Sequence, residues 1–167
     1  MKALNIIGRG DNWQAGTLAT DREKWIVSSA YFTRPGISVD KIFQLHTPNV
    51  WEPGCQDIKG RLVVAWDHPG FEPCERLPAG ALIDNFGQIF YSSISWMVGM
   101  AFYQGFDDIE LHGIDMLSAV EYIAQRDGLF YLLGILAGKG IKITVPETSG
   151  IFLPKECYGI PKKGLMN

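Results

Sequence analysis

Helical and strand patterns alternate through the second half of the chain. A mostly apolar helical stretch at 93–104 leads to the strand-like "DIELHG" at 108–113, and a longer helical stretch at about 118–138 leads to "IKITVP" at 141–146. A helix between two strands usually carries the chain across the sheet in a right-handed crossover, which makes the strands parallel. Further strand-like apolar runs occur in the first half: "ALNIIG", "KWIVSSAYF", "DKIFQLH" and "RLVVAW". The sequence therefore predicts a single Rossmann-like α/β domain, with a mostly parallel sheet and helices on both faces.

The composition of the sequence changes between residues 47 and 86. Five of the nine prolines fall between His46 and Gly87, together with several glycines, so we expect a long irregular insertion around one strand. Loops this long in compact domains are often ligand covers or interaction surfaces, although a plain surface insertion has the same composition. We expect the domain to span residues 1–153 and the end of the chain, 154–167, to form an extended arm.

A glycine turn, "GRGDNW", follows the first predicted strand. The dinucleotide fingerprint G-x-G-x-x-G would require glycine in place of Trp13, and no acidic residue follows at the spacing that a ribose needs, so an NAD site is disfavoured. Gly8 and Gly10 still allow close backbone approach, and the next helix start, with Asp11 and Asn12, offers N–H donors to an anion. The glycine turn predicts contact with a phosphate or ribose. The alternative is that it only reverses the chain direction.

Two serines and a carboxylate stand at opposite ends of the stretch "YSSISWMVGMAFYQGFDDIELHGIDM". Ser92 and Ser93 mark a helix start, where hydroxyl and N–H groups either cap the helix or hold a phosphate. Asp115 follows a strand and His112 is near it, at the sheet edge where ligands of parallel α/β proteins bind. Asp115 could accept hydrogen bonds from a sugar or act as a base, or it could only cap the next helix.

The segment "EYIAQR" begins a helix whose later part is almost wholly apolar. Glu121 and Gln125 are one helical turn apart, as are Tyr122 and Arg126, so each pair shares a face. A buried helix with a polar beginning should direct that beginning at a cleft or at solvent. Arg126 could bind a phosphate or carboxylate with two hydrogen bonds, or these residues could be solvated surface charges.

Composition limits the classes of partner. The net charge is −3 and no dense Lys/Arg stripe occurs, which disfavours a nucleic-acid or anionic-membrane surface. No apolar run is long enough to span a bilayer, and the first residues are too short in apolar character for a signal peptide. The cysteines are odd in number and widely spaced, which indicates free thiols and a cytoplasmic location; a homo-oligomer remains open. Cys55, His68 and Cys74 lack the close spacing of zinc ligands, so we expect no metal and no required cofactor.

These segments together resemble uncharacterised proteins of tailed bacteriophages. In that family a strand ending in an aromatic-x-x-His stretch, here "IFQLH", precedes the serine helix. More distantly, the serine helix and the "GIDM" strand are similar to bacterial sialyltransferases and to 6-hydroxymethylpterin diphosphokinase-like proteins, which bind nucleotides or nucleotide sugars. The resemblance implies ligand contacts by these residues: Gly8, Gly10, His46, Ser92, Ser93, Asp115, Glu121, Gln125 and Arg126. The chain departs from the sialyltransferases because no histidine follows His112, so sialyl transfer by their mechanism is not expected.

The leading functional hypothesis is a phage-type protein that binds a nucleotide or a nucleotide-derived small molecule. One form of it sequesters a host nucleotide signal without turnover. The alternative is a small transferase or hydrolase acting on a nucleotide or nucleotide sugar, with Asp115 or His46 as the base. A third hypothesis is a protein–protein inhibitor that acts through the 47–86 insertion.

Overall fold

A computed structural model describes residues 1–51, 53–66, 73–116, 120–147 and 149–151, with the backbone alone at residue 59 and at 120–124. It contains a seven-stranded sheet in which all paired strands are parallel. The strands are β1 (Ala3–Ile7), β2 (Glu23–Val27), β3 (Lys41–Gln44), β4 (Leu62–Val64), β5 (Glu75–Arg76), β6 (Asp108–His112) and β7 (Lys142–Thr144). The prediction of a Rossmann-like α/β domain is confirmed.

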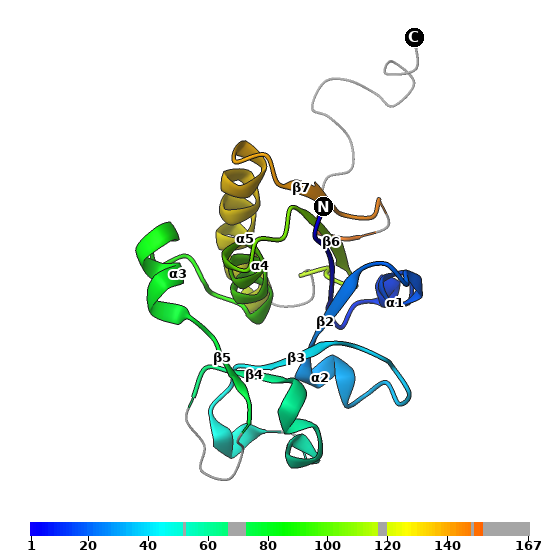
Figure 1. Ribbon diagram of the computed structural model, residues 1–167. Helices are drawn as coiled ribbons and strands as arrows, with labels where there is room; N and C mark the ends of the chain where they lie inside the picture. Colours follow the sequence, from blue (N-terminus) through cyan, green and yellow to red (C-terminus); the bar gives the residue numbers. More distant parts are fainter. Residues whose placement is uncertain (52, 67–72, 117–119, 148, 152–167) are drawn as a thin grey trace.

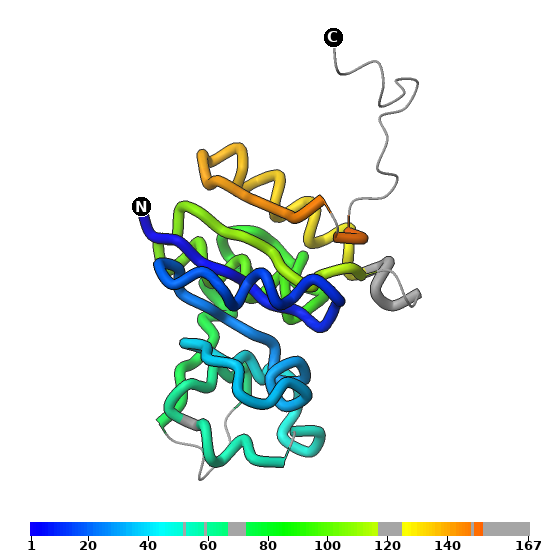
Figure 2. Tube along the Cα trace, turned by 90° about the vertical axis from the view of Figure 1, so that its right-hand side faces the viewer, coloured from blue at the N-terminus to red at the C-terminus, as the bar shows by residue number. Residues whose placement is uncertain are grey.

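The strand order is β5-β4-β3-β2-β1-β6-β7. The chain adds strands outward from β1 to β5 and then returns to the other side of β1 to form β6 (Figure 1). The order therefore reverses between β1 and β6, and crevices open at the carboxyl ends of strands at such a switch point. The segment from β3 to β5 gathers at one end of the molecule, as Figure 2 shows.

The helices cover both faces of the sheet. They are α1 (Ala15–Leu18), α2 (Ser28–Tyr31), α3 (Ala79–Phe86), α4 (Ser93–Tyr103) and α5 (Val120–Gly138), with short 3₁₀ helices at Asp11–Trp13, Pro48–Val50 and Cys55–Arg61. Strand residues alternate between two cores: Ile6 packs with α4 and α5, whereas the next residue, Ile7, packs on the side of α2. This alternation is the period of two that an extended strand imposes.

Two expectations about the elements are wrong in detail. The strand expected at 24–32 ends at Val27, and α2 follows at once, with the Phe32 N–H donating to the Ser28 carbonyl at 3.0 Å. The reason is that β1 and β3 end at the same edge, so residues after Val27 have no ladder partner. The 47–86 insertion is also more regular than expected, because β4, β5 and α3 lie within it.

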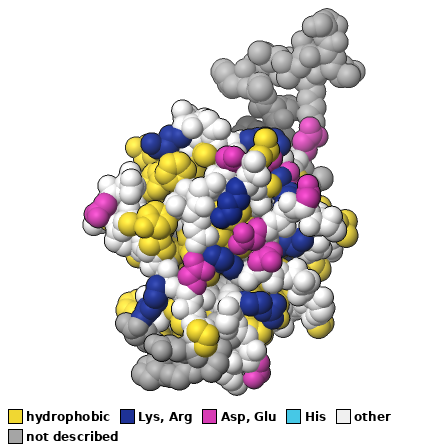
Figure 3. Space-filling view, viewed as in Figure 1, with side chains coloured by type: hydrophobic (Ala, Val, Ile, Leu, Met, Phe, Trp, Pro, Cys, Tyr) yellow, Lys and Arg dark blue, Asp and Glu magenta, His cyan; other side chains and the backbone are white. Residues whose placement is uncertain are grey.

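Two other expectations concern the distribution of charge on the surface and the presence of membrane-spanning helices. On the face shown in Figure 3, Lys and Arg side chains are interspersed with Asp and Glu. Among the residues that the structure describes, no helix combines the length and apolar character needed to cross a bilayer. The expected arm, 154–167, lies outside the described residues.

Candidate ligand-binding cleft

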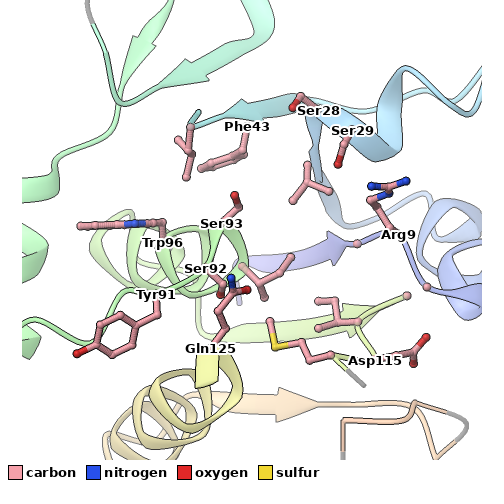
Figure 4. Close-up of a pocket in the computed structure, with 18 of the residues that line it drawn as sticks. Arg9, Ser28, Ser29, Phe43, Tyr91, Ser92, Ser93, Trp96, Asp115 and Gln125 are labelled. Carbon is pink, nitrogen blue, oxygen red and sulfur yellow. The ribbon is translucent and has the colours of Figure 1, made fainter. Parts of the chain in front are cut away.

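A cleft of about 1120 Å³ opens at the carboxyl edge of the sheet, at the switch point between β1 and β6 (Figure 4). Its lining comes from the ends of β1, β2, β3 and β6, from the start of α4 and from α5. The lining residues singled out by the sequence are Gly8, Gly10, Asp11, Asn12, His46, Ser92, Ser93, Asp115 and Gln125. The fold thus brings together residues as distant in the sequence as Gly8 and Gln125, because parallel strands end at a common edge.

The glycine turn after β1 interlocks with the turn after β6. The Gly8 N–H donates to the His112 carbonyl at 2.8 Å, and the Gly10 N–H donates to the Gly113 carbonyl at 2.6 Å. A Cβ at Gly8 would overlap the Gly113 carbonyl oxygen, and a Cβ at Gly10 would overlap the Asp115 carboxylate. The close approach that these glycines allow is therefore between two turns of the protein. Because their own N–H groups are engaged in these two hydrogen bonds, neither glycine offers an N–H donor to an anion.

Arg34 fixes the same turn from outside the cleft. Its guanidinium donates to the Gly8 carbonyl at 3.1 Å and to the Arg9 carbonyl at 2.7 Å, and it lies 4.6 Å from the centre of the Trp13 ring. Burial, together with the charge of Arg9, lowers the pKa of Arg34 from its usual value, and the guanidinium still carries its positive charge at neutral pH. Arg34 thus holds the backbone of the turn at Gly8 and Arg9. The side chain of Arg9 is exposed and lies at the cleft (Figure 4).

The start of α4 forms one wall of the cleft. Ser92 is the N-cap: its hydroxyl accepts from the Ser95 N–H at 3.1 Å, and the Ser95 hydroxyl accepts from the Ser92 N–H at 3.1 Å. Capping is thus the role of the Ser92 side chain. Ser93 and Ile94 occupy the first two helical positions, where backbone N–H groups have no acceptor within the helix. These N–H groups, with the Ser93 hydroxyl, are the donors that α4 offers to an anion.

Asp115 ties the end of β6 to the segment after β7. Its Oδ1 accepts from the Gly150 N–H at 2.9 Å, and the Ser149 hydroxyl donates to the Ile114 carbonyl at 2.7 Å. The next residue, Met116, has φ 50°, a left-handed conformation that costs energy in a residue other than glycine. Such strain is often retained at ligand sites, and Met116 lines the cleft.

His46 lies at the cleft from the end of β3. Its Nδ1 is 3.3 Å from the Gln44 Oε1. The backbone around it is held by two indole N–H groups, since Trp51 donates to the His46 carbonyl at 2.8 Å and Trp66 to the Leu45 carbonyl at 3.2 Å. These bonds give the wall around β3 a defined position although the sheet ladder has ended.

Two predicted site residues that the structure describes, His112 and Arg126, are not among those that line the cleft. His112 is buried on the face that α1 covers, against Gly16. Arg126 lies with its guanidinium 5.8 Å from the Phe130 ring centre, one helical turn away. The Glu121 side chain lies outside the described residues. Of the "EYIAQR" segment, Gln125 reaches the cleft.

The environment of His112 makes stability depend on pH. Burial lowers its pKa below the usual value, and a contact of 3.2 Å between its Nε2 and the Glu110 Oε2 opposes this only in part; the charge of Arg22 acts in the lowering direction. Below about pH 6.5 the unfolded chain therefore binds a proton that the folded chain does not. The free energy of unfolding should fall by up to about 1.4 kcal/mol per pH unit as the pH drops towards the folded-state pKa. Urea unfolding between about pH 7.5 and about pH 5 would test this, and His112→Gln should flatten the dependence.

Some lining residues were not expected from the sequence. They are Arg9, Ser28, Ser29, Phe43, Phe90, Tyr91 and Trp96, with several backbone and aliphatic contacts. Ser28 and Ser29 directly follow β2, so the strand-end rule would have found them if the end of β2 had been placed correctly. Among the residues that the structure describes, no group of three or more potential metal ligands comes together. Cys55 is buried and Cys74 is partly buried, and His68 lies outside the described residues.

The fold and the position of the cleft define a Rossmann-like α/β domain of the kind that binds ligands at the carboxyl edge of its sheet. Such a fold is also present in a structure of the sialyltransferase CstII from Campylobacter jejuni in complex with the substrate analogue CMP-3FNeuAc. That similarity has a TM-score of 0.59 at 15% sequence identity and covers 87% of this chain and 80% of that one. A second structure of CstII, in complex with cytidine-5'-monophosphate, matches with a TM-score of 0.47 at 14% identity over 87% and 79% of the two chains.

No family model matches the chain, and no curated protein matches it significantly. The expected resemblance to bacterial sialyltransferases is therefore confirmed as a likeness of fold. The resemblance to bacteriophage proteins stays a prediction.

Proposed function

We propose that the protein binds a nucleotide or a nucleotide-derived small molecule in the cleft between β1 and β6. The observation that carries the proposal is the start of α4, which lies in the wall of a large cleft at the switch point of the sheet. A helix N-terminus in that position suits a phosphate, because its N–H groups and its dipole both favour an anion. The shared fold with a protein whose structure holds a CMP-sugar analogue supports the same class of ligand.

The polar lining suits the parts of a nucleotide. The N–H groups of Ser93 and Ile94 would bind the phosphate, and Arg9 would add a positive charge from the opposite wall (Figure 4). Carboxylate oxygens of Asp11 and Asp115 can accept hydrogen bonds from ribose hydroxyls. The Asp115 Oδ1 already accepts a hydrogen bond from the Gly150 N–H. The other carboxylate oxygen, Oδ2, would therefore be the one to accept from a ribose hydroxyl.

A second candidate function is transfer or hydrolysis at the same site. Asp115 from β6 and His46 from β3 line one cleft, and either could serve as a general base towards a bound nucleotide or nucleotide sugar. Retention of the ligand unchanged would instead fit a protein that sequesters it, including a phage protein directed at a host nucleotide signal. Mass spectrometry of the ligand after incubation separates the two, and turnover should disappear in Asp115→Asn if Asp115 is the base.

A thermal-shift screen against nucleoside monophosphates, diphosphates and nucleotide sugars tests the proposal. A ligand at a hundredfold excess over its dissociation constant stabilises the folded state by about 2.7 kcal/mol. That should raise the melting temperature by roughly 5–10 °C in a domain of this size. No shift across the panel would reject nucleotide binding.

Ser93→Asp should reduce the shift by half or more at the same ligand concentration, because its carboxylate would stand where the phosphate binds. A like charge at that distance should weaken binding by more than about tenfold. The carboxylate near a helix start also favours the helix, so the melting temperature without ligand should not fall. Ser93→Ala is the matched control: it keeps the backbone N–H and should retain most of the affinity. Equal affinities of the two variants would contradict the phosphate position.

A further inference from the structure

Three aromatic side chains surround the start of α4 on the cleft side. Phe90 and Tyr91 directly precede the N-cap, and Trp96 lies in the first turn of the helix. All three line the cleft. The rings of Phe90 and Trp96 are stacked, with centroids 4.2 Å apart and planes 14° from parallel. We call Phe90, Tyr91 and Trp96 the aromatic shelf.

Two glycines hold the shelf in place. A Cβ at Gly99 of α4 would stand 2.7 Å from Cε1 of Phe90, so Phe90 fills a notch that only glycine leaves open. A Cβ at Gly128 of α5 would stand 2.5 Å from the Ile89 carbonyl oxygen and 3.0 Å from Cδ2 of Tyr91. The shelf therefore rests on the backbones of two helices. Aromatic groups that are already ordered lose little conformational freedom when a ligand binds.

The side chains of the aromatic shelf are more exposed than an aromatic side chain of the core. Trp25, in the sheet, is fully buried, whereas Tyr91 is 62% exposed and Trp96 and Phe90 are half-buried at the cleft. Phe90 and Trp96 pack against the core under α4 and α5 and also line the cleft. Rigid aromatic rings that remain accessible in a cleft offer their faces to a planar ligand group.

We infer that the base of a bound nucleotide stacks on the aromatic shelf while its phosphate lies at the start of α4. The inference rests on the proposed function and adds the orientation of the ligand. Shelf and helix start are contiguous in the chain, and Figure 4 shows Tyr91 and Trp96 on one side of the serines and Arg9 on the other. A nucleoside phosphate carries its planar base at one end and its anion at the other. Stacking on aromatic rings accepts any base, since every base has a π-face.

The test compares a nucleotide with a ligand that lacks the base. Isothermal titration would use the strongest binder among AMP, GMP, CMP and UMP, together with ribose 5-phosphate, on the wild type and on Trp96→Leu. Loss of one stacking partner should weaken nucleotide binding by roughly 5- to 150-fold. The affinity for ribose 5-phosphate should stay within about twofold, because its phosphate contacts are untouched. In the wild type, ribose 5-phosphate should bind more weakly than the nucleotide by a similar factor.

Two further variants keep the test decisive. Tyr91→Ala changes an exposed side chain, so folding should be preserved, and it should weaken nucleotide binding selectively but less than Trp96→Leu. Tyr103→Ala, at the far end of α4 and 57% exposed outside the lining residues, should change neither affinity. Trp96 also provides a signal: the nucleotide should quench wild-type fluorescence more than that of Trp96→Leu, and ribose 5-phosphate should quench neither.

The outcomes separate the two proposals. If nucleotide affinity survives in both shelf variants, or if Trp96→Leu weakens both ligands equally, the stacking position is wrong and nucleotide binding stands. If no nucleoside monophosphate, diphosphate or nucleotide sugar binds the wild type, the proposed function fails and the shelf assignment fails with it.

Discussion

Replacing Arg22 with methionine should lower the free energy of unfolding by about 3–5 kcal/mol. The Arg22 side chain is 10% exposed and bonds to two neighbouring strands, β1 and β6: it donates to Asn5 Oδ1 at 2.6 Å, to the Leu4 carbonyl at 3.0 Å and to Asp108 Oδ1 at 3.0 Å. Glu110 Oε1 lies 3.5 Å from the same group. Methionine fills a similar volume but removes the hydrogen bonds that Arg22 donates to Asp108 Oδ1, Asn5 Oδ1 and the Leu4 carbonyl.

Urea unfolding measures this effect, and Lys142→Met is its matched control. Lys142 also pairs with Asp108, at 2.9 Å, but its side chain is 62% exposed, so its loss should cost less than about 1 kcal/mol. Similar losses in the two variants would show that Arg22 contributes no more than a surface ion pair.

Acid titration gives the Arg22 prediction a second readout. The hydrogen bond from Arg22 lowers the pKa of Asp108 below its usual value, against the opposing effect of burial, with a further lowering from Lys142. The folded-state pKa is thus below the unfolded one. The resulting stabilisation is present above about pH 4 and is lost as the pH falls through the folded-state value. Arg22→Met should therefore be less sensitive to acid over that range than the wild type.

The sheet could be predicted from the sequence because its signals are local. Buried parallel strands read as short apolar runs, and the helices between them fix the direction of each strand. The same rule brought most of the expected site together: Ser93, Asp115 and His46 follow from placing strand ends and helix starts at one edge. The turn of α2 was missed because "KWIVSSAYF" reads as one apolar run, and only the shared end of the neighbouring strands stops β2 at Val27.

The side on which His112 lies was also available in the sequence. In β6 the polar residues Asp108, Glu110 and His112 alternate with Ile109 and Leu111, which pack in the core under α4 and α5. Because side chains alternate between the two faces of a strand, His112 lies with Glu110 on the face opposite to Ile109 and Leu111. It therefore does not point towards the start of α4.

The aromatic shelf, by contrast, could not be predicted from the sequence. Its geometry depends on Gly99 and Gly128, and nothing in the sequence shows that these glycines face Phe90 and Tyr91. The arrangement arises only when α4 and α5 pack together. Its residues read in the sequence as ordinary core aromatics.

Gly8→Ala should destabilise the protein by about 1–3 kcal/mol or more and weaken nucleotide binding by more than about tenfold. The added methyl group would overlap the Gly113 carbonyl oxygen and stand 2.9 Å from Cγ1 of Ile114. The Gly113 carbonyl oxygen is a backbone atom and accepts a hydrogen bond from the Gly10 N–H at 2.6 Å. The two turns can separate only by breaking hydrogen bonds, and that would move Arg9 and Asp115 together.

Gly134→Ala is the matched control for Gly8→Ala, measured by thermal unfolding and by nucleotide titration. Gly134 lies within α5, is exposed and has no atom within 4 Å of its added Cβ. Alanine there should stabilise the helix by up to about 1 kcal/mol and leave binding unchanged. If Gly8→Ala bound nucleotide with wild-type affinity, the cleft wall would not depend on the interlocked turns. Loss of binding in a folded Gly8→Ala protein would show that these glycines serve the ligand indirectly, through the packing of one turn on the other.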